Sequence, residues 1–159
     1  MPQITIEYMI MIPLLIMQIF LFPLTAAWLM SSWVDARQTL ALEETASHLG
    51  SSIQQIYSAL NHNSISTGTV RSSLAISPFI EGYAYTGNAS LRAAEANSSQ
   101  FLDITLKFMG GSIEATTSVT LGSNINWDAD SEFMSNSTDA NLVAEKLVNG
   151  TILLSFEGD

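Results

Sequence analysis

The chain contains no cysteine, and this absence excludes several classes of protein. Without thiols there is no disulfide framework, no zinc ribbon and no thiol nucleophile. Basic residues are also scarce: five Lys and Arg stand against fifteen Asp and Glu, and the net charge is −10. Because the five are scattered along the chain, they form no basic patch for nucleic acid or for anionic lipid headgroups. The negative charge indicates solubility and mutual repulsion rather than a particular partner.

Motifs of enzyme active sites are missing as well. The sequence has no G-x-S-x-G, no H-E-x-x-H, no P-loop and no Rossmann glycine pattern, and it holds only two histidines. We therefore expect no catalysis and no cofactor. One constellation alternates through a predicted loop at 124–132 and could offer oxygen ligands to calcium; it consists of Asn124, Asn126, Asp128, Asp130 and Glu132, of which the three acids are the candidate ligands. Counted as a helix–loop–helix calcium loop from Asp128, its sixth position is Phe133 where glycine is required, so a solvated loop is the favoured interpretation.

The N-terminal part is instead rich in apolar residues. Glu7 is the only charged residue among the first 34, and nearly every residue from 8 to 30 is apolar. A helix of about 20 apolar residues can cross a bilayer. A carboxylate within such a segment is costly unless it has a partner. The sequence thus predicts a lipid-compatible helix with one acid near its start.

The helical pattern continues beyond the apolar run. Apolar residues recur at a 4-3-4-3-4 spacing and draw one stripe on a helix that we expect to end near residue 60; they are Leu42, Ala46, Leu49, Ile53, Ile56 and Leu60. Pro13 and Pro23 each remove a backbone hydrogen bond and are expected to kink or loosen the apolar half. This divides residues 1–61 into an apolar part, 1–34, and an amphipathic part, 35–61.

The periodicity changes after residue 61, and residues 62–159 are expected to form a β-rich head. Predicted strands cover 69–76, 79–85, 90–96, 101–109, 112–121, 142–148 and 151–156. Along 101–108 the even-numbered residues are all apolar and alternate with a mostly polar set, which predicts a half-buried strand. Gly110-Gly111 predicts a hairpin between two of the strands, and further turns are predicted at Gly87-Asn88 and Asn149-Gly150. The predicted fold class is α+β, with a long helix carrying a small antiparallel β-sandwich.

Asn-X-Ser/Thr sequons occur only after the apolar helix, at Asn88, Asn97, Asn136 and Asn149. They favour an outside-facing head that carries N-linked glycans. The positive-inside tendency opposes this topology, because the first basic residue, Arg37, follows the helix. A basic leader cut off before the apolar run would remove the conflict.

The N-terminal residues carry a resemblance to a known family. Gln-Ile-Thr-Ile-Glu-Tyr at positions 3–8, followed by the apolar run, resembles the N-terminus of archaeal type IV pilin-like proteins. The resemblance implies cleavage by a prepilin peptidase before this segment. It also implies that the helix first anchors the subunit in the membrane and then packs with other copies in a filament core. Gln3, Glu7 and Tyr8 are the implied assembly residues, and Glu7 would neutralise a backbone amino terminus and so set the register between subunits.

Two departures leave parts of this interpretation open. The acid is the fifth residue only when counted from Gln3, so the resemblance does not show whether Met1 and Pro2 persist in the mature chain. Glu7, Pro13 and the Leu-rich run are also similar to small minor pilins of the Tad type.

We therefore expect a non-enzymatic subunit of an extracellular type IV pilus-like filament that serves adhesion or cell contact. Its partners would be copies of itself, the membrane before assembly and the pilus assembly machinery. The alternatives are a minor pilin, or a single-pass membrane-anchored surface or binding protein that does not polymerise. An anchor alone requires about 20 apolar residues and no buried charge.

Overall fold

The computed structural model describes residues 3–93 and 99–158, with side chains described from Tyr8 onward. Contacts between residues divide the chain into two compact units, Met1–Arg37 and Gln38–Asp159. Helix α1 (Gln3–Leu60) begins in the first unit and ends in the second. The amphipathic half of the helix therefore belongs to the same unit as the β strands.

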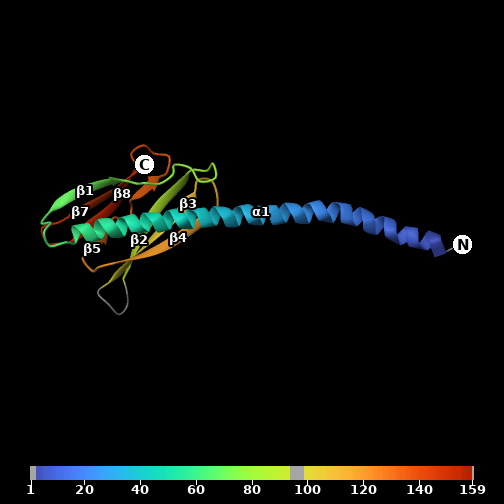
Figure 1. The fold of residues 1–159 in the computed structure, drawn as a ribbon, viewed down its shortest axis with the longest axis horizontal. Helices are drawn as coiled ribbons and strands as arrows, with labels where there is room; N and C mark the ends of the chain where they lie inside the picture. Colours follow the sequence, from blue (N-terminus) through green and yellow to red (C-terminus); the bar gives the residue numbers. More distant parts are fainter. Residues whose placement is uncertain (1–2, 94–98, 159) are drawn as a thin grey trace. The chain divides into compact units, whose positions relative to one another are not determined.

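The described residues of the second unit form two four-stranded sheets (Figure 1). In order across the first sheet, the strands are β1 (Gly68–Ser73), β7 (Asn141–Lys146), β8 (Ile152–Glu157) and β5 (Ile125–Trp127). In order across the second sheet, they are β4 (Glu114–Leu121), β3 (Gln100–Phe108), β2 (Tyr85–Ala93) and β6 (Glu132–Met134). Neighbouring strands are antiparallel except β5 and β8, which are parallel. The predicted α+β class is confirmed.

One hydrophobic core joins the helix to both sheets. The predicted helical stripe is buried at Leu42, Ala46, Leu49, Ile53 and Leu60, and Ile56 is partly buried. Alternate residues of β3 and β8 meet this stripe from the two sheets; they are Leu102, Ile104, Leu106, Phe108, Ile152, Leu154 and Phe156. Because successive strand residues point to opposite faces, each sheet offers one apolar face to the core.

The helix approaches the second sheet closely at Gly50. A Cβ added to Gly50 would lie 2.5 Å from Cγ2 of Val119 and 3.6 Å from Cδ1 of Ile104. Glycine lowers helix stability by about 1 kcal/mol relative to alanine. Here it has a packing role, because only a residue without a side chain allows this helix–sheet distance.

The hairpin prediction at Gly110-Gly111 is confirmed. Strands β3 and β4 pair in antiparallel register from Gln100↔Leu121 to Lys107↔Glu114, and Gly110 has a positive φ of 78°. The predicted alternation also holds, since the even-numbered residues from Leu102 to Phe108 are buried. The turn predicted at Asn149-Gly150 is present too, with Gly150 at a φ of 83° between β7 and β8.

Two predictions around β2 are wrong. Gly87-Asn88 is not a turn, because both residues lie inside β2. A Cβ on Gly87 would lie 2.3 Å from the ring of Phe133, its partner on β6, so the glycine leaves room for an aromatic side chain. Residues 79–84 of the predicted strand 79–85 instead form a tight turn, with Glu81 and Gly82 at positive φ and an isolated bridge between Ile80 and Tyr83, while Tyr85 opens β2.

Two strands went unpredicted, because 124–132 was interpreted as a loop. The segment contains β5, and Glu132 opens β6. Each of these strands has three residues, which is too short for a clear alternation of apolar and polar residues. The predicted strand 90–96 extends into residues 94–96, which lie outside the described residues.

The C-terminal end of α1 is capped by a lysine from another element. The last turn of the helix contains no basic residue. Lys146, at the end of β7, is buried and donates hydrogen bonds from Nζ to the carbonyl oxygens of Leu60 (2.7 Å) and His62 (3.2 Å). A cation at this position satisfies carbonyls that lack helical partners and interacts favourably with the helix dipole.

Candidate functional site

The most unusual surface of the chain is the apolar segment, residues 8–34 of α1. Every residue in it is exposed, so the helix is exposed on all of its faces here. The aromatic side chains are among the most exposed, with Phe22 at 76% and Trp33 at 79%. By length and composition the helix can cross a membrane, and none of the most apolar stretch is buried. Apolar surface on this scale marks contact with lipid or with other protein chains.

The helix assignment is unbroken through Pro13 and Pro23. Each proline lacks an N–H, so the carbonyls of Met9 and Ile19, four residues earlier, lose their usual helical donors. Thr25 adds a local contact, because its Oγ1 donates to the carbonyl oxygens of Leu21 and Phe22 at 3.0 Å. In lipid, freed backbone groups must find partners within the protein.

The three residues implied in assembly lie at the start of the helix. Gln3, Glu7 and Tyr8 are all helical. The side chain of Tyr8 is 62% exposed. The side chains of Gln3 and Glu7 lie outside the described part of the structure, as do Met1 and Pro2, so the partner of Glu7 stays a prediction.

The described sequons all have exposed asparagines. Asn88 projects from β2, Asn136 lies in the turn after β6, and Asn149 lies in the turn between β7 and β8. The Oδ1 of Asn149 accepts a hydrogen bond from the N–H of Thr151 at 3.0 Å. Asn97 lies outside the described residues. The three described sites are accessible to a glycosyltransferase, and their occupancy stays a prediction.

The acidic segment forms a turn rather than a cage of ligands. Oδ1 of Asp128 accepts the N–H of Asp130 at 3.3 Å, and the carbonyl of Asp128 accepts both the N–H and the hydroxyl of Ser131. Glu132 is exposed on β6. Within the described residues, no group of three or more His, Asp or Glu side chains is placed to hold a metal ion.

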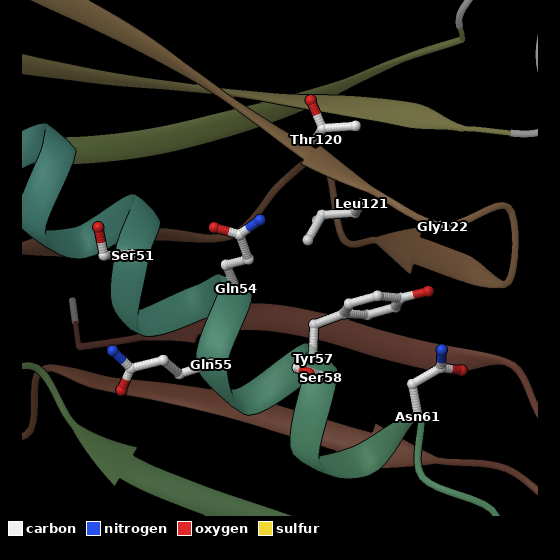
Figure 2. A pocket seen from close by; sticks show the side chains of 9 residues that line it. All are labelled: Ser51, Gln54, Gln55, Tyr57, Ser58, Asn61, Thr120, Leu121 and Gly122. Atoms are coloured by element: carbon white, nitrogen blue, oxygen red, sulfur yellow. The ribbon is translucent and has the colours of Figure 1, made fainter.

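A groove of about 590 Å³ lies between the last turns of α1 and the end of β4 (Figure 2). Its lining consists of Ser51, Gln54, Gln55, Tyr57, Ser58, Asn61, Thr120, Leu121 and Gly122. In Figure 2 the Tyr57 ring lies below Leu121 and Gly122. The Tyr57 hydroxyl donates to Oδ1 of Asn124 at 2.7 Å, and Nδ2 of Asn124 donates to Oδ1 of Asn61 at 2.9 Å. Hydroxyls and amides in such a groove can form hydrogen bonds to a neutral partner, but they provide no acid–base pair.

Two described groups have shifted pKa values, and both are structural. Burial raises the pKa of Tyr85 to about 12, and its hydroxyl donates to the carbonyl of Ser77 at 2.8 Å. The hydrogen bond from the Ser118 hydroxyl, followed by the bond and charge of Arg92, lowers the pKa of Asp103. Asp103 lies on the polar outer face of the second sheet, where Nε of Arg92 is 3.1 Å from its Oδ2. Neither group adjoins a second titratable residue in the arrangement of an acid–base site.

Sequence reasoning identified the apolar segment and missed the contacts that connect α1 to the strands. The Lys146 cap and the Tyr57–Asn124 hydrogen bond each join residues more than 60 positions apart. The only local signal for the cap was the lack of a basic residue in the last helical turn.

Comparisons with known proteins assign no family. No protein-family model, curated protein sequence or solved structure matches the chain. A functional proposal therefore rests on the chemistry of the apolar segment and on the N-terminal resemblance.

Proposed function

We propose that the chain is a structural subunit of an extracellular type IV pilus-like filament that polymerises through its N-terminal helix. The observation that carries the proposal is the apolar segment, exposed on every face and joined in one helix to a folded β-rich unit. The resemblance of residues 3–8 to archaeal pilin-like proteins supports the same function.

The exposure pattern fits two successive environments. A helix with one apolar face packs on one partner, whereas a helix that is apolar all round requires an apolar environment on every side. Lipid provides that environment before assembly, and a bundle of identical helices provides it afterwards. Since lipid tails are as apolar as leucine, transfer from membrane to filament gains little hydrophobic energy and depends on packing and polar contacts.

Glu7 would supply such a polar contact. An unpaired carboxylate in an apolar environment is expensive, while a carboxylate paired with an amino terminus is tolerated at one axial position only. A helix bundle with uniform apolar packing could slide along its axis. Pairing of Glu7 would fix the register.

A membrane-anchored surface protein that never polymerises is the competing function. It would use the apolar segment equally well but would leave Glu7 without a role. Our test is to shear the cell surface mechanically and to follow the protein by immunoblot and immunogold labelling. Recovery in sheared filaments labelled along their length supports the proposal. Retention of all the protein in the membrane fraction, on cells that carry filaments, contradicts it.

A further inference from the structure

Three exposed apolar side chains gather on two adjoining turns of the second unit. Phe79 and Tyr83 lie in the turn before β2, with 52% and 54% of their surfaces exposed, and Met109 lies in the β3–β4 turn with 43% exposed. The N–H of Met109 donates to the carbonyl of Ala84 at 2.9 Å, which joins the two turns. We call Phe79, Tyr83 and Met109 the apolar tip.

The tip lies at the end of the second unit where α1 enters it. Along β4, Leu121 and Gly122 border the same groove as Tyr57, while Thr117 and Val119 adjoin Gly50. Residues nearer the start of β4 thus lie beside earlier residues of the helix, from Tyr57 back toward Gln38. The β3–β4 turn precedes the start of β4, so the tip lies at the Gln38 end. Figure 1 shows the loop before β2, in light green, at this end of the strands.

The tip is held firmly. Tyr83 packs edge-on against Phe108, with ring centroids 5.8 Å apart. The Ser135 hydroxyl accepts the N–H of Tyr85 at 2.9 Å and donates to the carbonyl of Pro78 at 2.8 Å. With the Tyr85–Ser77 hydrogen bond, these contacts fix both ends of the turn that carries Phe79 and Tyr83. Its apolar side chains are therefore displayed by the fold rather than exposed by a loose loop.

We propose that the apolar tip contacts the headgroup layer of the bilayer while the apolar segment spans it. This inference rests on the membrane stage of the proposed function. Gln38 follows Val34 by four residues, which is about 6 Å of helical rise. Each headgroup layer is about 5–8 Å thick. Chain connectivity alone therefore keeps Gln38 within about one headgroup layer of the apolar segment, and aromatic rings are favoured in that layer.

The absence of native cysteine allows a direct test. Single-cysteine variants Phe79→Cys and Met109→Cys would each carry an environment-sensitive fluorophore. Val148→Cys is the matched control, because Val148 is apolar and 93% exposed. It follows β7, whose Lys146 contacts the Leu60 end of the helix. The full chain is placed in phosphatidylcholine vesicles that contain lipids spin-labelled at the headgroup, and Trp28 and Trp33 report insertion through quenching by brominated acyl chains.

We expect spin-labelled lipid to quench the fluorophores at 79 and 109 at least threefold more than the fluorophore at 148. If Trp28 and Trp33 are quenched while all three fluorophores stay equally accessible to water, the helix is inserted and the tip proposal is wrong. Protection of 79 and 109 in filaments but not in vesicles would make the tip a contact between subunits, which also overturns it. Failure of Trp28 and Trp33 to insert would contradict the membrane stage itself.

Discussion

At the scale of single residues, Lys146 is a side chain of strand β7 that caps the C-terminal end of helix α1. It is among the few buried polar residues described, and both of its hydrogen bonds go to carbonyls at or just after the end of α1. Tyr85 acts similarly through Ser77. Both residues join segments that are distant in sequence or lie in different elements.

Lys146→Met should destabilise the second unit by about 1–3 kcal/mol, because two carbonyls lose a charged donor in a buried position. Denaturant unfolding of the full chain in detergent, followed by circular dichroism, measures the change. Lys107→Met is the control, since Lys107 is exposed on β3 and should change stability by about 0.5 kcal/mol or less. Equal effects of the two substitutions would remove the capping role from Lys146.

The raised pKa of Tyr85 predicts that the free energy of unfolding depends on pH in the alkaline range. Its pKa rises from 10.0 to about 12 on folding, so the unfolded chain releases the proton at lower pH than the folded chain. The free energy of unfolding should therefore fall as pH rises from about 10 toward about 12. Tyr85→Phe should be less stable at neutral pH, because the Ser77 carbonyl loses its donor, and should have a flatter alkaline profile. A slope unchanged by the substitution would exclude Tyr85 as its source.

The hypothesis that a polar contact fixes the axial register between subunits depends on Glu7. Glu7→Ala should leave membrane insertion intact but block or disorder filament assembly, because residues 1–34 keep their apolar surface and lose their only charged side chain. Membrane fractionation and electron microscopy of the same cells measure the two properties. Glu7→Asp, which keeps the charge on a shorter side chain, should assemble better than the alanine variant. Normal filaments from Glu7→Ala would refute the hypothesis.

At the scale of elements, the sequence predicts strongly periodic segments well. The alternation of buried Leu102, Ile104 and Leu106 along β3 predicted both the strand and its buried face. The turn predicted at Gly87 failed because glycine has two uses that look alike in a sequence: a turn, and a close approach by a neighbouring side chain. Phe133 decides between them, and β6 was itself too short to predict.

The apolar segment was also predictable from the sequence. Its exposure on every side follows from composition alone, since the helix has no polar face there that would turn one side toward water and the other toward a core. The apolar tip was not predictable, because residues 79–85 have the composition of a strand. In the structure, paired backbone hydrogen bonds between Ile80 and Tyr83 close a turn, and Ser135 and Tyr85 hold the carbonyls just before it. Side chains of Gln3 and Glu7 lie outside the described part of the chain, so the proposed assembly contact rests on sequence.

A substitution at Gly50 tests the close contact between helix α1 and the second sheet. Alanine at an ordinary helical glycine stabilises by about 1 kcal/mol. Gly50→Ala should instead destabilise by about 1–3 kcal/mol, because its methyl group would lie 2.5 Å from Val119. The double variant Gly50→Ala/Val119→Ala should recover much of the loss relative to Val119→Ala. Thermal unfolding of the four proteins forms the cycle, and additive effects would contradict the contact.

At the scale of the whole molecule, the net charge would oppose the proposed assembly. The net charge is −10, and basic side chains make contacts within the chain: Lys146 to carbonyls, Arg71 to Glu157 and Arg92 to Asp103. Copies brought together by their helices, as proposed, would therefore repel one another through their acidic side chains.

Purified filaments should consequently be more resistant to dissociation at about 1 M salt than at about 0.05 M, since screening shortens the range of the repulsion. Sedimentation of filaments after dilution measures the polymerised fraction. The exposed Glu132 and Asp139 offer a matched change: Glu132→Gln/Asp139→Asn should reduce the salt dependence. Filaments that dissociate as salt rises would indicate that attractive ion pairs dominate instead.

We propose that identical apolar helices form the core of a filament. Electron cryo-microscopy of filaments sheared from the cell surface, with helical reconstruction, tests it most directly. We predict a core of packed helices into which residues 8–34 fit, with the β-rich units on the outside and density joining Glu7 to an amino terminus. Filaments whose core density fits another sequence, with this chain absent from them, would contradict the account and leave the helix as a membrane anchor.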